Sequence, residues 1–70
     1  MERHHVSSSD LSSVGFDPST NTLEIEFLSG SIYQYHNVPE NIYDGLMNAG
    51  SHGQYFHNHI KDVFQYSRIS

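Results

Sequence analysis

The segment Thr22–Phe27 (TLEIEF) constrains the fold most, because its side chains alternate strictly between polar and apolar. A period of two is typical of a β-strand with one face in the core and the other in water. Leu23, Ile25 and Phe27 would face the core, while the two glutamates between them would lie on the solvated outer face. The rest of the chain must therefore cover the apolar face of this strand.

The turn after this strand decides which face the next strand presents, and Tyr33 and Tyr35 lie in that next strand. With a two-residue loop of Ser29 and Gly30, both tyrosines would share the face of the glutamates. That loop favours a type I′ turn, which needs positive φ at both positions, and serine is poor there. With a three-residue loop that starts at Leu28, only Gly30 takes a positive φ, which costs glycine little. We therefore predict the three-residue loop.

The three-residue loop sets the pairing of the two strands and the role of the tyrosines. Ile25 then pairs with Tyr33. Leu23 pairs with Tyr35, so both rings join the apolar face, and a slip of one residue would reverse this result. The register favours core packing for the tyrosines, with their hydroxyls at the rim of the sheet. The alternative is a platform on which unpaired bases stack, and it requires that the rings be uncovered.

Two amphipathic segments after the strands predict helices over residues 39–49 and 52–64. Gly50 would end the first helix as a left-handed cap. Ser51 and Gln54 form a capping box at the start of the second helix. The side chains expected to face the sheet are Ile42, Tyr43, Leu46, Met47, Phe56, Ile60, Val63 and Phe64.

The order of these elements predicts an α+β fold, a three-stranded antiparallel β-meander followed by two α-helices packed on one sheet face. The strands are expected at about residues 9–16, 22–28 and 31–36. In the first strand Leu11 is out of phase with Val14, and a β-bulge would bring both to the same face. One sheet face is thus left to the helices and the other to water.

Length and composition limit the organisation of the chain. Seventy residues make one domain, and we expect residues 1–8 to be a flexible N-terminal segment and residues 9–70 to be that domain. Tyr66 and Ile69 in the tail are expected to dock on the sheet. The chain has no cysteine, which excludes disulfides, and no apolar run reaches the roughly 18 residues of a membrane span. The polar N-terminus carries no signal core, so we expect a cytoplasmic protein. We also expect a monomer or a weak dimer.

The charges of the chain limit which nucleic acids it can bind, and how strongly. The formal net charge is −5 at pH 7, and Arg3, Lys61 and Arg68 are the only arginine and lysine residues. Proteins that bind nucleic acids usually carry a basic patch, because neutralised phosphates supply most of their affinity. Strong RNA binding is therefore not expected, and weak RNA binding would use Lys61 and Arg68 as phosphate contacts.

The six histidines do not form a recognisable metal site. His57 and His59 would lie about 200° apart around a helix, so they could not share one ligand face. No HExxH pattern occurs. Ser51 beside His52 is better explained as a helix cap than as a nucleophile with its base. We therefore expect no metal, no cofactor and no enzymatic activity.

Two motifs resemble those of a known family. They are YQY at residues 33–35, followed by VP at residues 38–39, and SHGQYF at residues 51–56. Their order resembles the KTSC domain family over about residues 6–69. That family takes its name from a domain at the C-terminus of some lysyl-tRNA synthetases. It also occurs as a small stand-alone protein in bacteria and phages.

The function of that family is not established, and its synthetase context suggests RNA binding by analogy. Where the family usually has asparagine after the second motif, this chain has His57 followed by Asn58. The residues favour a protein-binding adaptor, since the expected outer sheet face carries Ile32, Gln34 and His36 among acids. An accessory RNA-binding domain is the alternative. The candidate ligand-binding residues are Tyr33, Tyr35, Asn58, Lys61 and Arg68.

Overall fold

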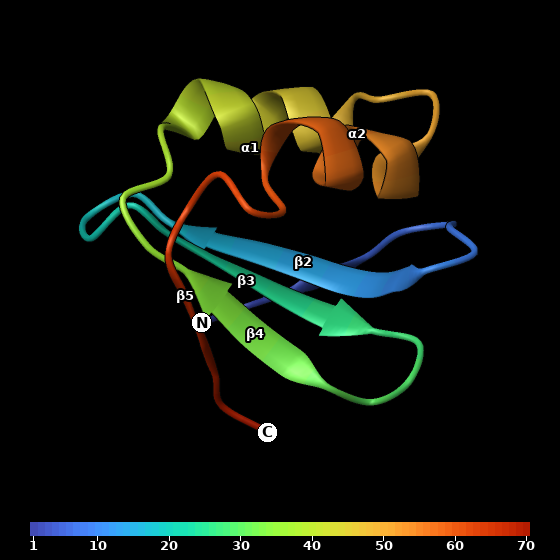
Figure 1. The fold of residues 1–70 in the computed structure, drawn as a ribbon, viewed down its shortest axis with the longest axis horizontal. Coiled ribbons are helices and arrows are strands. Elements are labelled where there is room, and N and C mark those ends of the chain that lie inside the picture. Colours follow the sequence, from blue (N-terminus) through green and yellow to red (C-terminus); the bar gives the residue numbers. More distant parts are fainter.

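The computed structural model describes all 70 residues, and it has a five-stranded antiparallel sheet with two helices on one face (Figure 1). The elements are β1 (His4–His5), β2 (Leu11–Asp17), β3 (Thr22–Phe27), β4 (Ile32–Tyr35), α1 (Glu40–Met47), α2 (His52–His59) and β5 (Tyr66–Arg68). Neighbours in the sheet follow chain order. Each helix has eight residues, and neither is long and apolar enough to cross a membrane. The α+β class is confirmed, whereas the prediction of a three-stranded sheet is wrong.

Both additional strands come from the ends of the chain. β1 pairs with β2 through His4 and His5, and β5 pairs with β4 so that Tyr66 lies opposite Tyr35. These strands have two and three residues, too few to show an alternating pattern in the sequence. The expected docking of Tyr66 on the sheet is confirmed. The boundary expected after residue 8 is not a boundary of the sheet, because β1 lies before it.

The pairing of β3 with β4 has the predicted register. Ile25 lies opposite Tyr33, and Leu23 lies opposite Tyr35 on the same face. Gly30 has a φ of +97°, in the left-handed region. The loop is closed by two hydrogen bonds of 2.9 Å, from Phe27 N–H to the Ser31 carbonyl and from Gly30 N–H to the Phe27 carbonyl. The three-residue loop is therefore confirmed.

The expected bulge is present in β2, where the pairing with β3 shifts register between Leu11 and Ser13. Leu11 and Val14 have no exposed surface although they are three residues apart, and the bulge turns both side chains toward the helices. The buried core consists of Leu11, Val14, Leu23, Ile25, Tyr35, Val38, Leu46, Phe56 and Ile60.

The first helix ends differently from the prediction. Pro39 is extended and occupies the N-cap position, so α1 begins one residue later than expected. At the other end, the backbone N–H and the side-chain amide of Asn48 donate to the Asp44 carbonyl at 3.1 and 2.8 Å. The predicted left-handed cap at Gly50 is wrong, since Gly30 is the only glycine with positive φ. Asn48 does part of the capping that the prediction assigned to glycine.

The second helix starts where predicted and is shorter than predicted. Ser51 Oγ accepts the Gln54 N–H at 3.2 Å, which confirms the N-cap. α2 ends at His59, and Asp62 then adopts a φ of +62°, which an α-helix cannot contain. As a result Val63, expected in the core, is 61% exposed. The chain thus turns away from the helix axis after His59, so Val63 does not extend the apolar stripe of α2.

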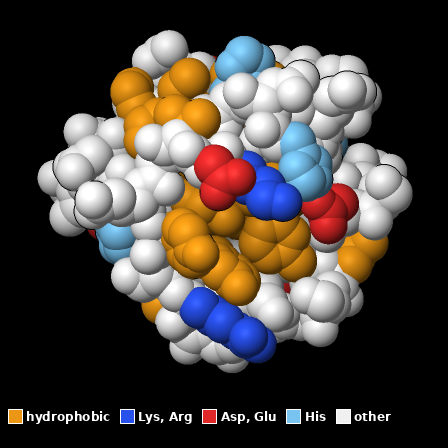
Figure 2. Space-filling model, in the orientation of Figure 1, with side chains coloured by type: hydrophobic (Ala, Val, Ile, Leu, Met, Phe, Trp, Pro, Cys, Tyr) orange, Lys and Arg blue, Asp and Glu red, His pale blue; other side chains and the backbone are white.

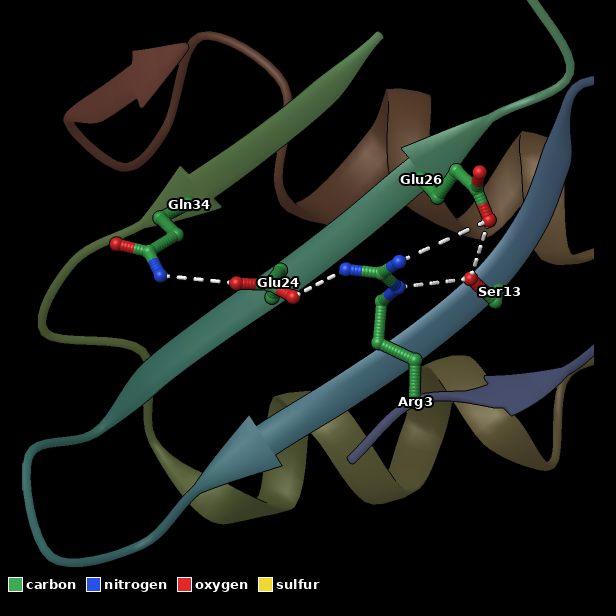
Figure 3. Close-up of polar contacts among 5 residues, drawn as sticks. All are labelled: Arg3, Ser13, Glu24, Glu26 and Gln34. Carbon is green, nitrogen blue, oxygen red and sulfur yellow. Dashed lines mark hydrogen bonds and ion pairs between the residues drawn. The ribbon is translucent and has the colours of Figure 1, made fainter. Parts of the chain in front are cut away.

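A polar network covers the outer face of the sheet (Figure 3). The Arg3 guanidinium donates to Glu24 and, at 3.0 Å, to Ser13 Oγ. Gln34 donates to Glu24 at 2.9 Å, and Ser13 donates to Glu26 at 2.9 Å. Glu24 is only 5% exposed, so the prediction that it lies on a solvated face is wrong. Burial alone would raise the pKa of Glu24, but the hydrogen bonds from Gln34 and Arg3 outweigh it and hold that pKa below its usual value.

A glycine allows the N-terminal backbone to reach this network. A Cβ atom on Gly15 would lie 2.4 Å from the carbonyl oxygen of Glu2, closer than real side chains permit. Gly15 therefore lets the chain before β1 lie directly on β2. This close approach places Arg3 over the outer face, where the buried carboxylate of Glu24 needs a cation.

We expect Gly30→Val to lower the free energy of unfolding by about 1–3 kcal/mol, because a β-branched residue is strained at positive φ. Urea unfolding followed by circular dichroism measures this change. Gly50→Val is the matched control, since Gly50 lies in open space and does not have positive φ. An equal loss of stability in both variants would contradict the assignment of the strain to the turn.

We expect Arg3→Met to lower the free energy of unfolding by about 2 kcal/mol at pH 7, because it removes charged hydrogen bonds to a buried carboxylate. The pKa of Glu24 is lowered by folding, so its ionised form stabilises the fold above the unfolded pKa of about 4.3. That contribution is lost as the pH falls through the lower, folded pKa. The difference between the two proteins should therefore shrink when urea unfolding is repeated at acid pH.

Lys61→Met is the control for this comparison, because it changes the net charge equally and Lys61 takes part in no ion pair. Its stability difference from the wild type should be small at both pH values. A deficit of Arg3→Met that is the same at pH 7 and at acid pH would contradict the role given to Glu24.

Candidate ligand-binding site

The face of the sheet that carries the helices is not fully covered. Between α2, the turn after it, and strands β3 to β5 lies a hollow of about 620 Å³. We call it the tyrosine hollow. Its aromatic lining consists of Phe27, Tyr33, Tyr35, Phe56 and Tyr66, and its charged or titratable lining consists of Asp10, His57, Lys61 and Asp62. In Figure 2 an area of hydrophobic side chains has basic, acidic and histidine side chains along its edge.

Sheet geometry brings three tyrosines together in this hollow. Tyr33 and Tyr35 are two apart on β4, so they share a face, and their ring centroids are 6.4 Å apart with nearly parallel planes. Tyr66 lies opposite Tyr35 on β5. Its ring is tilted against both, with centroid distances of 5.4 and 5.7 Å. Phe56 of α2 meets Tyr35 edge to face at 5.6 Å. The arrangement is an aromatic cluster rather than isolated rings.

Burial decreases across the cluster from the core to the edge of the sheet. Tyr35 is 5% exposed, which confirms core packing for this ring. Burial raises the pKa of Tyr35 to about 12, and the neighbouring Tyr33 and Tyr66 add to the shift. Tyr33 is half-buried, whereas Tyr66 is 56% exposed. One end of the cluster therefore stabilises the fold, and the other end presents aromatic surface to solvent.

Two backbone features place the charged groups beside these rings. The Asp10 carbonyl accepts the Leu28 N–H at 2.9 Å, which holds the segment before β2 against the turn after β3. Lys61 and Asp62 follow α2, where Lys61 N–H donates to the Phe56 carbonyl at 2.9 Å and Asp62 has positive φ. These groups come from separate loops, and each loop is held by main-chain hydrogen bonds.

The predicted site residues are distributed unevenly. Tyr33, Tyr35 and Lys61 line the tyrosine hollow. Arg68 lies opposite Tyr33 on β5, so it shares the face of that tyrosine at the edge of the sheet. Asn58 is exposed on α2 and does not line the hollow. The structure therefore brings four of the five candidates to one region of the molecule.

Other residues of the hollow were missed by the sequence analysis. Tyr66 was expected only to dock on the sheet, and Asp10 and Asp62 were not considered as site residues. The spacing of Tyr66 and Arg68 by two residues was the available signal for a strand that shares the face of Tyr33 and Tyr35. Nothing local marks Asp10, because it reaches the hollow only through the pairing of distant segments.

The hollow offers aromatic faces, carboxylates and one ammonium group, which suit a ligand held by stacking, cation–π contact and ion pairing. His57 Nε2 lies 3.8 Å from Asp10 Oδ2, an exposed pair at its edge. Nowhere in the structure do three histidine, aspartate or glutamate side chains gather as a metal site.

Comparison with known proteins finds lysine–tRNA ligases and an uncharacterized protein that are similar to this chain. A lysine–tRNA ligase of Nostoc sp. is 51% identical over 55 residues, which cover 79% of this chain and 10% of the ligase. Two further lysine–tRNA ligases, from Trichormus variabilis and Nostoc punctiforme, match over the same lengths, so the chain spans about a tenth of these relatives. An uncharacterized protein of Stutzerimonas stutzeri is 40% identical over 70 residues, 99% of each chain.

A solved structure and a family model also match this chain. A crystal structure of a KTSC domain protein from Yersinia pestis superposes with a TM-score of 0.96 at 40% identity, covering 99% of this chain and 97% of that one. The model of the KTSC domain matches residues 7–64. The match includes both motifs on which the resemblance was based. The chain therefore belongs to the KTSC domain family.

Proposed function

We propose that the protein is a small non-enzymatic interaction module, a protein-binding adaptor whose binding surface is the tyrosine hollow. The observation that carries this proposal is the aromatic cluster on the helix side of the sheet, whose outer end at Tyr66 is exposed. Tyr66 and Leu28, both lining the hollow, are 56% and 59% exposed. Large apolar side chains around a depression are typical of the central anchors of protein interfaces.

This proposal moves the binding surface from one face of the sheet to the other. The sequence analysis based the adaptor on Gln34, His36 and Ile32 of the outer face. Gln34 donates to Glu24 at 2.9 Å, and His36 Nε2 lies 3.1 Å from Ser67 Oγ. These polar groups already have partners within the chain, so a ligand would have to displace them. The hollow requires no such exchange.

An accessory RNA-binding domain is the second candidate. It is favoured by the match of 55 residues to lysine–tRNA ligases, which are proteins that act on RNA. It is also favoured by the placement of Lys61 in the hollow and of Arg68 opposite Tyr33, since single-stranded nucleic acids combine base stacking with phosphate contacts. The net charge of −5 opposes it.

The adaptor proposal predicts that peptide binders depend on the hollow. Random 12-residue peptides displayed on phage are selected against the wild-type chain, and their affinities are then measured by fluorescence anisotropy. Tyr66→Ala should weaken the selected peptides about tenfold or more, because it removes an exposed aromatic anchor. Val63→Ala is the matched control, an exposed apolar residue outside the hollow, and it should leave the affinity nearly unchanged.

Circular dichroism of both variants separates loss of binding from loss of fold. Equal affinity of the selected peptides for the wild type and a folded Tyr66→Ala would show that they bind elsewhere, which contradicts the proposal. Failure to select any peptide would also count against it.

For RNA, we expect weak binding with a shallow salt dependence, a log–log slope on the order of −2 for single strands, because few phosphates can be neutralised. Anisotropy of a labelled single-stranded RNA across salt concentrations measures the slope. Replacing Lys61 and Arg68 by alanine should abolish the salt-dependent part. Tight binding with a steep slope would instead support the RNA-binding candidate over the adaptor.

A further inference from the structure

The aromatic lining of the hollow has a chemical preference of its own. The faces of tyrosine and phenylalanine rings carry negative partial charge and attract cations that approach within about 6 Å of the ring centre. Tyr33, Tyr35 and Tyr66 present such rings in one cluster, with Phe27 edge-on to Tyr33 at 5.7 Å. Clusters of this kind favour an ammonium or guanidinium group over an anion.

The charged groups of the hollow add to this preference. Two carboxylates, Asp10 and Asp62, line it, against a single ammonium group, that of Lys61. The same carboxylates contribute to the raised pKa of Tyr35, so their negative potential extends to its phenol. At the edge of the hollow lie two further basic residues, His57 beside Asp10 and Arg68 opposite Tyr33 on β5. The chain as a whole has a net charge of −5, which attracts basic partners at long range.

We propose that the tyrosine hollow is a receptor for an arginine side chain presented by a basic segment of a partner protein. This inference rests on the proposed adaptor function and names the chemistry of the partner. A guanidinium is planar, stacks on aromatic faces and forms paired hydrogen bonds with a carboxylate, so it uses both parts of the lining. A phosphate in the same place would face two carboxylates, with Lys61 as the one ammonium group of the lining.

Two peptides that differ only in charge test the inference. Ac-Gly-Arg-Gly-NH₂ and its citrulline analogue, nearly the same shape but neutral, are titrated into ¹⁵N-labelled protein at low salt. The arginine peptide should bind at least about fivefold more tightly, with shifts at the amides of Tyr33, Asp62 and Tyr66. Equal binding of both peptides, or no shifts with either, would overturn the inference.

Charge variants of the protein give the second arm. Asp62→Asn should weaken the arginine peptide about threefold or more, and asparagine tolerates the positive φ of this position. Lys61→Gln should strengthen it, because a like charge is removed. Asp44→Asn is the control, an exposed aspartate outside the hollow whose loss changes the net charge equally. It should leave the affinity nearly unchanged.

The sign of the Lys61→Gln effect decides between a cation and an anion. An anionic ligand would be weakened by this variant, so a loss of arginine-peptide affinity would overturn the inference. If the display-selected peptides depend on Tyr66 but arginine and citrulline bind equally, the adaptor function stands and only the cation preference fails. If the selected peptides ignore Tyr66 altogether, the proposed function itself fails.

Discussion

The fold depends on the backbone conformation of Gly30. Its positive φ closes a three-residue loop, and the loop sets the register in which Ile25 faces Tyr33. A shift by one residue would turn the β4 tyrosines outward and bring Ile32 and Gln34 under the helices. The conformation of this one turn therefore places Tyr33 and Tyr35 in the aromatic cluster, on the side of the sheet that carries the helices.

The ends of the chain complete what this register begins. Arg3 donates to Glu24, which is almost fully buried on the outer face. On the inner face, Tyr66 of β5 extends the aromatic cluster by one strand. A small domain buries a limited share of its surface, so such terminal additions matter more than they would in a larger protein. One terminus satisfies a buried charge, and the other builds a wall of the candidate site.

What could be predicted from the sequence was local. Turn chemistry placed Tyr33 and Tyr35 on the correct face, and the N-cap at Ser51 followed from a single spacing. The burial of Glu24 was not predictable, because it depends on an arginine 21 positions away. The charge of Asp62 was visible, but its position beside the tyrosines depends on a helix that stops earlier than its apolar pattern indicates. For each residue that the sequence analysis missed, tertiary contacts determine its burial or its position.

The hollow lies where the helical layer stops short of the C-terminal edge of the sheet. No residue of α1 lines the hollow, so the covering layer ends with α2 while the sheet continues through β4 and β5. The small residues Ser9, Ser29 and Ser31 at its edge do not close the gap. A sheet widened by its C-terminal strand, beyond the cover of α2, leaves aromatic surface in contact with water, and the proposed adaptor function rests on this surface.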